Sequence, residues 1–100
     1  TALADALKFN AVLNKIVLSG NMIRDEGAIA LGEALKSNKT LKELDLFNCS
    51  IGAKGGKALA AALGTAALTK LDARHNYFRL ENDKLLQDAA EGREGFELLL

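Results

Sequence analysis

The chain repeats a leucine-rich pattern at a nearly constant spacing, and this periodicity limits the possible folds more than any other feature. The three copies begin at Leu13, Leu41 and Leu68. Three downstream columns keep the same phase: Asn21, Cys49 and Asn76, then Ile23, Ile51 and Phe78, then Gly27, Gly55 and Asn82. Self-similarity at a fixed period of this kind is typical of solenoids, in which each unit buries its apolar face against its neighbours. The sequence therefore predicts a stacked repeat array.

Each repeat contains two different hydrophobic periods. Ile16 and Leu18 alternate with outward-facing residues, which is the period of a strand with one buried face. Gly27, Leu31 and Ala34 then fall at i, i+4 and i+7, the stripe of an amphipathic helix. We therefore expect one short strand and one helix in each repeat, joined by turns that contain glycine or asparagine.

The pattern LxxLxLxxN, followed by glycine and an LxxAL helix, resembles the leucine-rich repeat of the ribonuclease-inhibitor type. That family includes the repeat regions of NOD-like receptors and of the Ran GTPase-activating protein. The resemblance implies an α/β fold, a right-handed αβ solenoid that forms a horseshoe segment with parallel strands on the concave side and helices on the convex side. The third copy departs from the pattern at Ala73, Asn82 and Ala90, as is typical of a terminal repeat.

The repeat register divides the chain without breaking it into separate domains. A mass of 10.6 kDa suits one core. We expect a single leucine-rich repeat segment over residues 1–100, composed of a partial repeat (1–12), three repeats (13–40, 41–67 and 68–95) and a closing strand (96–100). The step from Leu13 to Leu41, counted again from Leu68, leads to Phe96 and would place Leu99 in the column of Leu71.

The first residues of the chain begin inside a repeat. Leu3, Ala6 and Leu7 fit the helical columns, with no strand before them. We therefore expect the chain to be a fragment of a longer repeat array. A preceding repeat or a partner subunit would cover the edge of the first strand, because an uncovered edge presents unpaired hydrogen-bonding groups.

Composition excludes some partners. The 13 Lys and Arg residues balance the 13 Asp and Glu residues, so the net charge gives no reason to expect binding to nucleic acid or to an anionic membrane. The apolar runs are only a few residues long, too short to span a bilayer. A single cysteine cannot form an internal disulfide, which favours a reducing, cytoplasmic location.

The residues that most resemble catalytic or ligand-binding groups have simpler explanations. Cys49 could be a nucleophile or a redox sensor, but its column otherwise holds Asn, which indicates an inward turn residue. His75 is the one histidine and has no companion ligands. Residues 52–58 lack the glycine and hydroxyl positions of a phosphate-binding loop. Asp25 is interpreted as a charge in the first turn of a helix, where it complements the dipole of that helix. We expect no catalytic residue, no metal and no cofactor.

The outward positions of the strands form the remaining candidate site. Phe47 has no inward role in the pattern, and exposed aromatic residues often anchor interfaces. The alternative is that Phe47 packs along the side chains of its neighbours. The predicted partner-binding residues are Lys15, Val17, Glu43, Asp45, Phe47, Lys70, Asp72 and Arg74.

These observations favour one functional class and leave two others open. The prediction is a non-enzymatic scaffold that binds another protein, or a neighbouring subunit, through its concave strand face. The first alternative is a structural subunit packed in a large assembly. The second is a GTPase-activating or regulatory protein, which the family resemblance allows.

Overall fold

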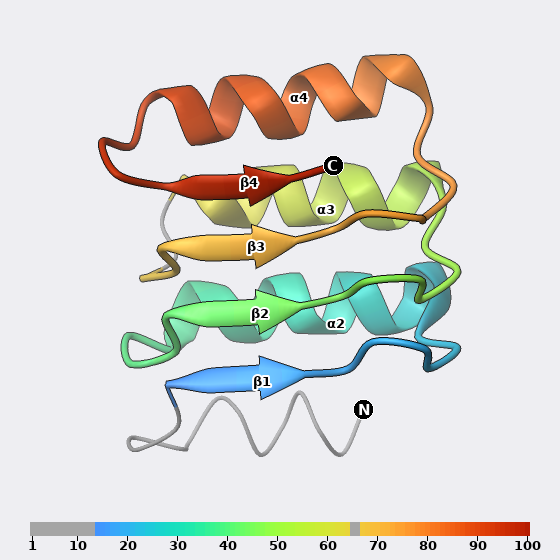
Figure 1. The fold of residues 1–100 in the computed structure, drawn as a ribbon, viewed down its shortest axis with the longest axis horizontal. Helices are drawn as coiled ribbons and strands as arrows, with labels where there is room; N and C mark the ends of the chain where they lie inside the picture. The colour runs from blue at the N-terminus through green and yellow to red at the C-terminus, as the bar shows by residue number, and fades with distance from the viewer. Residues whose placement is uncertain (1–13, 65–66) are drawn as a thin grey trace.

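The computed structural model describes residues 14–64 and 67–100, and in this part of the chain strands and helices alternate. The strands form one parallel sheet in the order β1-β2-β3-β4; in Figure 1, α2 and α3 lie behind this sheet and α4 lies above β4. The elements are β1 (Lys15–Val17), α2 (Arg24–Ser37), β2 (Glu43–Asp45), α3 (Ala53–Leu63), β3 (Lys70–Asp72), α4 (Leu80–Glu91) and β4 (Glu97–Leu99). The predicted fold class, an α/β solenoid, is confirmed. The expected partial repeat over residues 1–12 lies outside the described residues.

The strand register reproduces the repeat spacing. Ile16 pairs with Leu44, and Leu44 pairs with Leu71. These central residues are buried, whereas Lys15 and Val17 on either side of Ile16 point away from the helices. Because side chains alternate across a strand, the central residue of each strand is the one that packs against the helices.

The closing strand differs from the prediction by one position. Leu71 pairs with Leu98, so the count that placed Leu99 in this column was wrong. The reason is the turn after α4, in which Phe96 N donates to Arg93 O and Gly95 adopts a positive φ of 78°. This tight turn brings β4 into register one position early.

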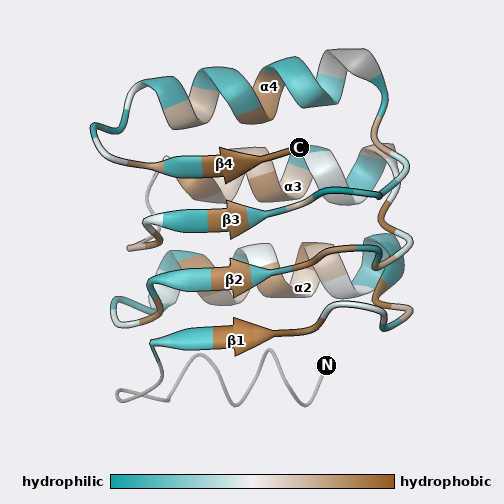
Figure 2. Cartoon of the chain, viewed as in Figure 1, coloured by the Kyte–Doolittle hydropathy of each residue, from teal (hydrophilic) through white to brown (hydrophobic). Residues whose placement is uncertain are grey.

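The core lies between the sheet and the helices, and the centre of each strand is apolar (Figure 2). Full burial of an aliphatic side chain contributes about 1.5–3 kcal/mol, so a few such residues dominate the stability. The largest fully buried side chains are Leu31, Leu35, Leu41, Leu44, Leu46, Ile51, Leu59, Leu63, Leu68, Leu71 and Leu86.

Small residues bring α2 and α3 close together. A Cβ at Gly32 would lie 3.2 Å from the carbonyl oxygen of Ala58, and a Cβ at Gly55 would lie 2.9 Å from Ala28 Cβ. Asp25 adds a polar contact, because its Oδ1 accepts hydrogen bonds from Gly52 N and Gly55 N, both at 2.8 Å. The carboxylate therefore caps α3, the helix of the next repeat. Asp25 also lies in the first turn of α2, as expected, so it serves both helices.

A left-handed residue follows each of the first three strands at the same repeat position. Gly20, Asn48 and His75 have φ values of 78°, 54° and 60°. Glycine and asparagine adopt this conformation readily, whereas histidine does so at some cost. The next residue of the column is buried at Cys49 and partly buried at Asn76, whereas Asn21 in the first repeat is exposed.

Within residues 14–64 and 67–100, no helix has the length and apolar character needed to cross a membrane.

Candidate partner-binding strand face

We define the strand face as the sheet surface away from the helices, together with the turns that follow β2 and β3. The structure places the predicted residues on this face in three columns. The first column is Lys15, Glu43 and Lys70, extended by Glu97; the second is Val17, Asp45 and Asp72, extended by Leu99; the third is Phe47 and Arg74 in the turns.

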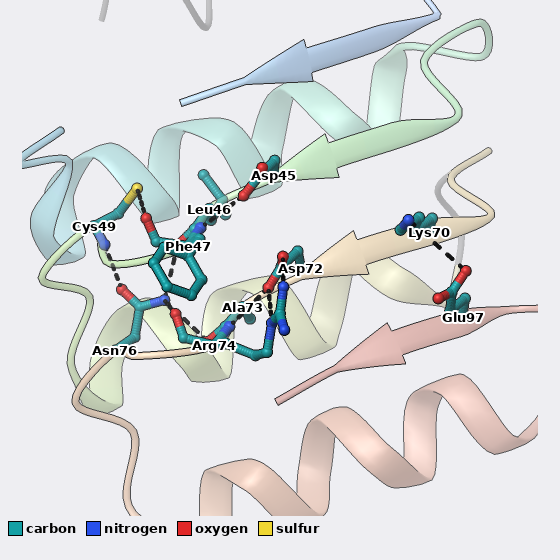
Figure 3. A network of polar contacts seen from close by, with 10 residues as sticks. All are labelled: Asp45, Leu46, Phe47, Cys49, Lys70, Asp72, Ala73, Arg74, Asn76 and Glu97. Atoms are coloured by element: carbon teal, nitrogen blue, oxygen red, sulfur yellow. Dashed lines mark hydrogen bonds and ion pairs between the residues drawn. The ribbon is translucent and has the colours of Figure 1, made fainter. Parts of the chain in front are cut away.

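The first column alternates in charge. Lys15 Nζ lies 3.5 Å from Glu43 Oε2, and Lys70 Nζ lies 3.9 Å from Glu97 Oε1 (Figure 3). Exposed ion pairs of this kind contribute little to stability. Their effect is to cancel the field of the column, so it attracts neither a strongly acidic nor a strongly basic surface. Sequence reasoning missed Glu97 because the closing strand was counted one position out of register.

Asp72 is buried, contrary to the prediction that it is exposed. It is only 7% exposed, because the guanidinium of Arg74 folds across its carboxylate. Arg74 Nε donates to Oδ1 at 3.0 Å and Nη2 donates to Oδ2 at 2.8 Å (Figure 3). The Arg74 side-chain hydrogen bonds are the main reason that the pKa of Asp72 lies below its usual value. A partner on the strand face would therefore meet Arg74 rather than Asp72.

Phe47 is half-buried, which corrects the expectation of an exposed aromatic residue. It lies in the turn after β2, where its ring centroid is 4.9 Å from that of His75. The guanidinium of Arg74 lies 5.4 Å from the centre of the same ring. The structure thus shows the alternative packing, in which Phe47 rests on its neighbours. Phe47, Arg74 and His75 form one cluster, which we call the turn cluster.

Cys49 lies beneath the turn cluster and is fully buried. Its Sγ donates to the carbonyl oxygen of Leu18 at 3.1 Å, so it links two successive turns. Burial raises the pKa of the Cys49 thiol, which keeps it protonated and poorly nucleophilic. The prediction of an inward turn residue is confirmed.

Asn76 holds the turns after β2 and β3 together. Its Oδ1 accepts hydrogen bonds from Cys49 N at 3.0 Å and Ile51 N at 3.1 Å. Its Nδ2 donates to Leu46 O at 2.8 Å and Ala73 O at 3.0 Å (Figure 3). This network satisfies backbone groups that the turns leave unpaired, and it fixes the backbone that carries Phe47 and Arg74.

Sequence reasoning missed exposed apolar residues in the loops that follow the strands. Met22 is 68% exposed and Tyr77 is 70% exposed. Each directly follows the inward turn residue of its repeat, in the column that also contains Ser50. This shared column was the available signal, because two large apolar residues at an outward loop position are unusual in a short repeat.

Residues 9–32 and 37–60 match the family described as Leucine Rich repeat. Over these two stretches the chain is similar to leucine-rich repeats. A solved structure of Leiomodin-1 Actin-Binding Site 2 has a TM-score of 0.79 and 24% identity, and covers 96% of this chain and 58% of its own. The Caenorhabditis elegans tropomodulin C-terminal domain has a TM-score of 0.84 and 20% identity, covering 97% and 60%. The chain therefore spans less than two thirds of either structure. Comparison with curated protein sequences found no match.

The strand face of the chain is nearly flat. Its one depression among the described cavities is about 60 Å³, far smaller than the roughly 300–1,000 Å³ of typical ligand pockets. Within residues 14–64 and 67–100, no three His, Cys, Asp or Glu side chains are grouped so that they could hold a metal ion. A flat surface of this kind suits contact with another macromolecule better than capture of a small molecule. The depression is lined by Lys15, Glu43, Leu44, Asp45, Lys70 and Asp72.

Proposed function

We propose that the chain is a non-enzymatic interaction module whose strand face binds another protein. Leucine-rich repeats and the solved structures that resemble this chain support a protein-interaction role. The observation that carries the proposal is the strand face itself, which is flat, mixed in charge and continuous with a half-buried aromatic cluster.

The turn cluster supplies the anchors of the proposed interface. Aromatic residues and arginine are enriched among the residues that dominate binding energies. Arg74 is held by Asp72, and Phe47 is held by His75 and Arg74, so these side chains lose little freedom when a partner docks. Val17, which is 55% exposed, adds apolar area at the other edge of the face.

Actin is the partner that we propose to test first. One similar structure is named as an actin-binding site. The proposal covers the remaining predictions as well: a single repeat segment of the ribonuclease-inhibitor type that acts in the cytoplasm. The regular spacing of Leu13, Leu41 and Leu68 and the single unpaired cysteine support it.

Co-sedimentation with actin filaments, with and without strand-face substitutions, tests this function. Val17→Ala with Phe47→Ala should weaken binding at least about tenfold while changing the free energy of unfolding by about 1 kcal/mol or less. Ile29→Ala is the matched control, because Ile29 is 41% exposed but lies on α2 behind the sheet. Binding that only the control weakens would reject the strand face, and absence of co-sedimentation would reject actin.

A further inference from the structure

The N-termini of α3 and α4 have different surroundings. At α3, Asp25 of the preceding repeat binds Gly52 N and Gly55 N. At α4, the residue that corresponds to Asp25 in the repeat register is Ala53, which carries no carboxylate. In the described part of the chain, no side chain accepts a hydrogen bond from the corresponding N–H groups of Arg79 and Asn82.

The backbone at the two termini is nevertheless similar. The residue before each helix is extended, with φ of −100° at Gly52 and −87° at Arg79. The helix dipole favours negative charge at both places. Within the described residues, the second terminus therefore keeps the geometry of a capped helix without a side-chain cap, and Asn82 N donates to Arg79 O at 2.9 Å.

A cavity of about 460 Å³ lies where that acid would project. We call it the α3–α4 groove; its lining residues are Ala53, Lys54, Lys57, Asn82 and Leu85. Lys54 and Lys57 are exposed on α3 and bring two positive charges to the groove. Among the described side chains that line the groove, none is acidic.

Asn82 provides independent support for a ligand. It is only 6% exposed, yet its side chain makes no hydrogen bond within the described part of the chain. In those residues, no fully enclosed side-chain nitrogen or oxygen lacks a partner. The amide atoms of Asn82 must therefore open onto the groove that this residue lines. Water reaches these atoms in the groove, and a ligand with a hydrogen-bond acceptor would bind Asn82 Nδ2 in its place.

We propose that the α3–α4 groove binds the carboxylate of an acidic side chain presented by a partner protein. The carboxylate accepts a hydrogen bond from Asn82 Nδ2 and pairs with Lys54 and Lys57. Ala53 and Leu85, which is 43% exposed, contact an apolar residue beside the acid. This mixed lining favours a peptide segment over a free anion. The groove lies on the helix side, so it is separate from the strand face and does not depend on actin binding.

The experiment titrates the full chain with two capped tripeptides, Leu-Asp-Ala and Leu-Asn-Ala, and follows the side-chain amide resonances of Asn82 by NMR. The aspartate peptide should shift these resonances and the asparagine peptide should not. Lys54→Gln with Lys57→Gln should weaken the affinity about tenfold, because hydrogen bonds to charged groups are lost. Ala53→Asp should abolish binding, since it supplies the carboxylate from within the chain.

Gln87→Asp is the matched control, because it adds the same charge at an exposed position of α4 that does not line the groove, and it should leave binding unchanged. The backbone amide spectrum reports whether each variant is folded. If Ala53→Asp does not fold, the Lys54→Gln, Lys57→Gln variant decides the question. Equal binding of both peptides, or no shift with either, would overturn the proposal. Inorganic phosphate that binds more tightly than the aspartate peptide would also overturn it, by showing a site for free anions.

Discussion

The two junctions between successive repeats have the same topology but are held by different contacts. Between α2 and α3, Gly32 and Gly55 allow close packing and Asp25 caps α3, beside a groove of about 360 Å³. Between α3 and α4 the groove is about 460 Å³, and Asn76 ties the turns on the other side of the junction. Equivalent positions in a solenoid therefore do not carry equal shares of the stability.

The second junction has one more tie at the end of the helices. Arg93, in the turn after α4, donates from Nη1 to Leu63 O at 3.1 Å, so it satisfies a carbonyl at the C-terminus of α3. The same guanidinium lies 5.0 Å from the ring centre of Phe96. Polar side chains from the third repeat thus compensate for its looser helix packing.

The largest effect should follow loss of the turn-side tie. Asn76→Ala leaves Cys49 N, Ile51 N and two carbonyl groups without partners, and should lower the free energy of unfolding by about 3–4 kcal/mol, measured by urea denaturation. In the first junction, Cys49→Ala removes the weak hydrogen bond from the thiol to Leu18 O. This change should lower the free energy of unfolding by only about 1 kcal/mol. Equal losses in the two variants would show that the junctions are held in the same way.

A smaller loss should follow interference with the close helix contact. Gly55→Ala places a Cβ against Ile51, 2.8 Å from Asp25 Oδ1 and 2.9 Å from Ala28 Cβ, and should cost about 2–3 kcal/mol. Gly64→Ala, at the C-cap of α3, is the control. A Cβ at Gly64 meets nothing within 4 Å and φ is −65°, so this change should be neutral or stabilise by up to about 1 kcal/mol. A tolerated Gly55→Ala would mean that the first junction has room to open.

Removal of the cap in the first junction should be milder. Asp25→Ala takes away the acceptor for Gly52 N and Gly55 N and should lower the free energy of unfolding by about 1–2 kcal/mol in thermal melts. Glu26→Ala, at the exposed neighbouring position, should change it by about 0.5 kcal/mol or less. If Glu26→Ala proves the more damaging, the acid that stabilises α3 has been misidentified.

The repeat columns predicted most of the architecture, because leucines at a regular spacing determine which residue of each strand faces the core. The prediction failed at β4, where Gly95 stands in the column of Leu68 and the turn is one position shorter. No apolar side chain marks the register there, so the repeat spacing alone could not show the shift of one position.

Contacts between repeats were the part that sequence could not give. The link from Asp25 to Gly52 and Gly55 spans a whole repeat, and helix patterns describe only neighbours within one helix. The cover of Asp72 by Arg74 depends on how the arginine side chain turns, although residues two apart on a strand share a face. The column of Asn76, by contrast, was interpreted correctly because its repetition is visible in the sequence.

The smallest of these effects concerns the second column of the strand face, where successive repeats again differ. Asp72 is covered by Arg74, whereas the turn after Asp45 carries Phe47 instead. Arg74 lowers the pKa of Asp72 in the folded protein, while the Asp72 carboxyl in the unfolded chain has a pKa of about 3.9. The pair therefore stabilises the fold fully above the unfolded pKa, and the contribution disappears as pH falls through the lower folded pKa.

Urea midpoints measured from pH 6 down to pH 2 should fall less steeply for Asp72→Asn than for the unsubstituted chain. Asp88→Asn, at an exposed position on α4, should leave the slope unchanged. An unchanged slope for Asp72→Asn would mean that Arg74 does not hold this carboxylate in solution, and that Asp72 faces a partner as openly as its column predicted.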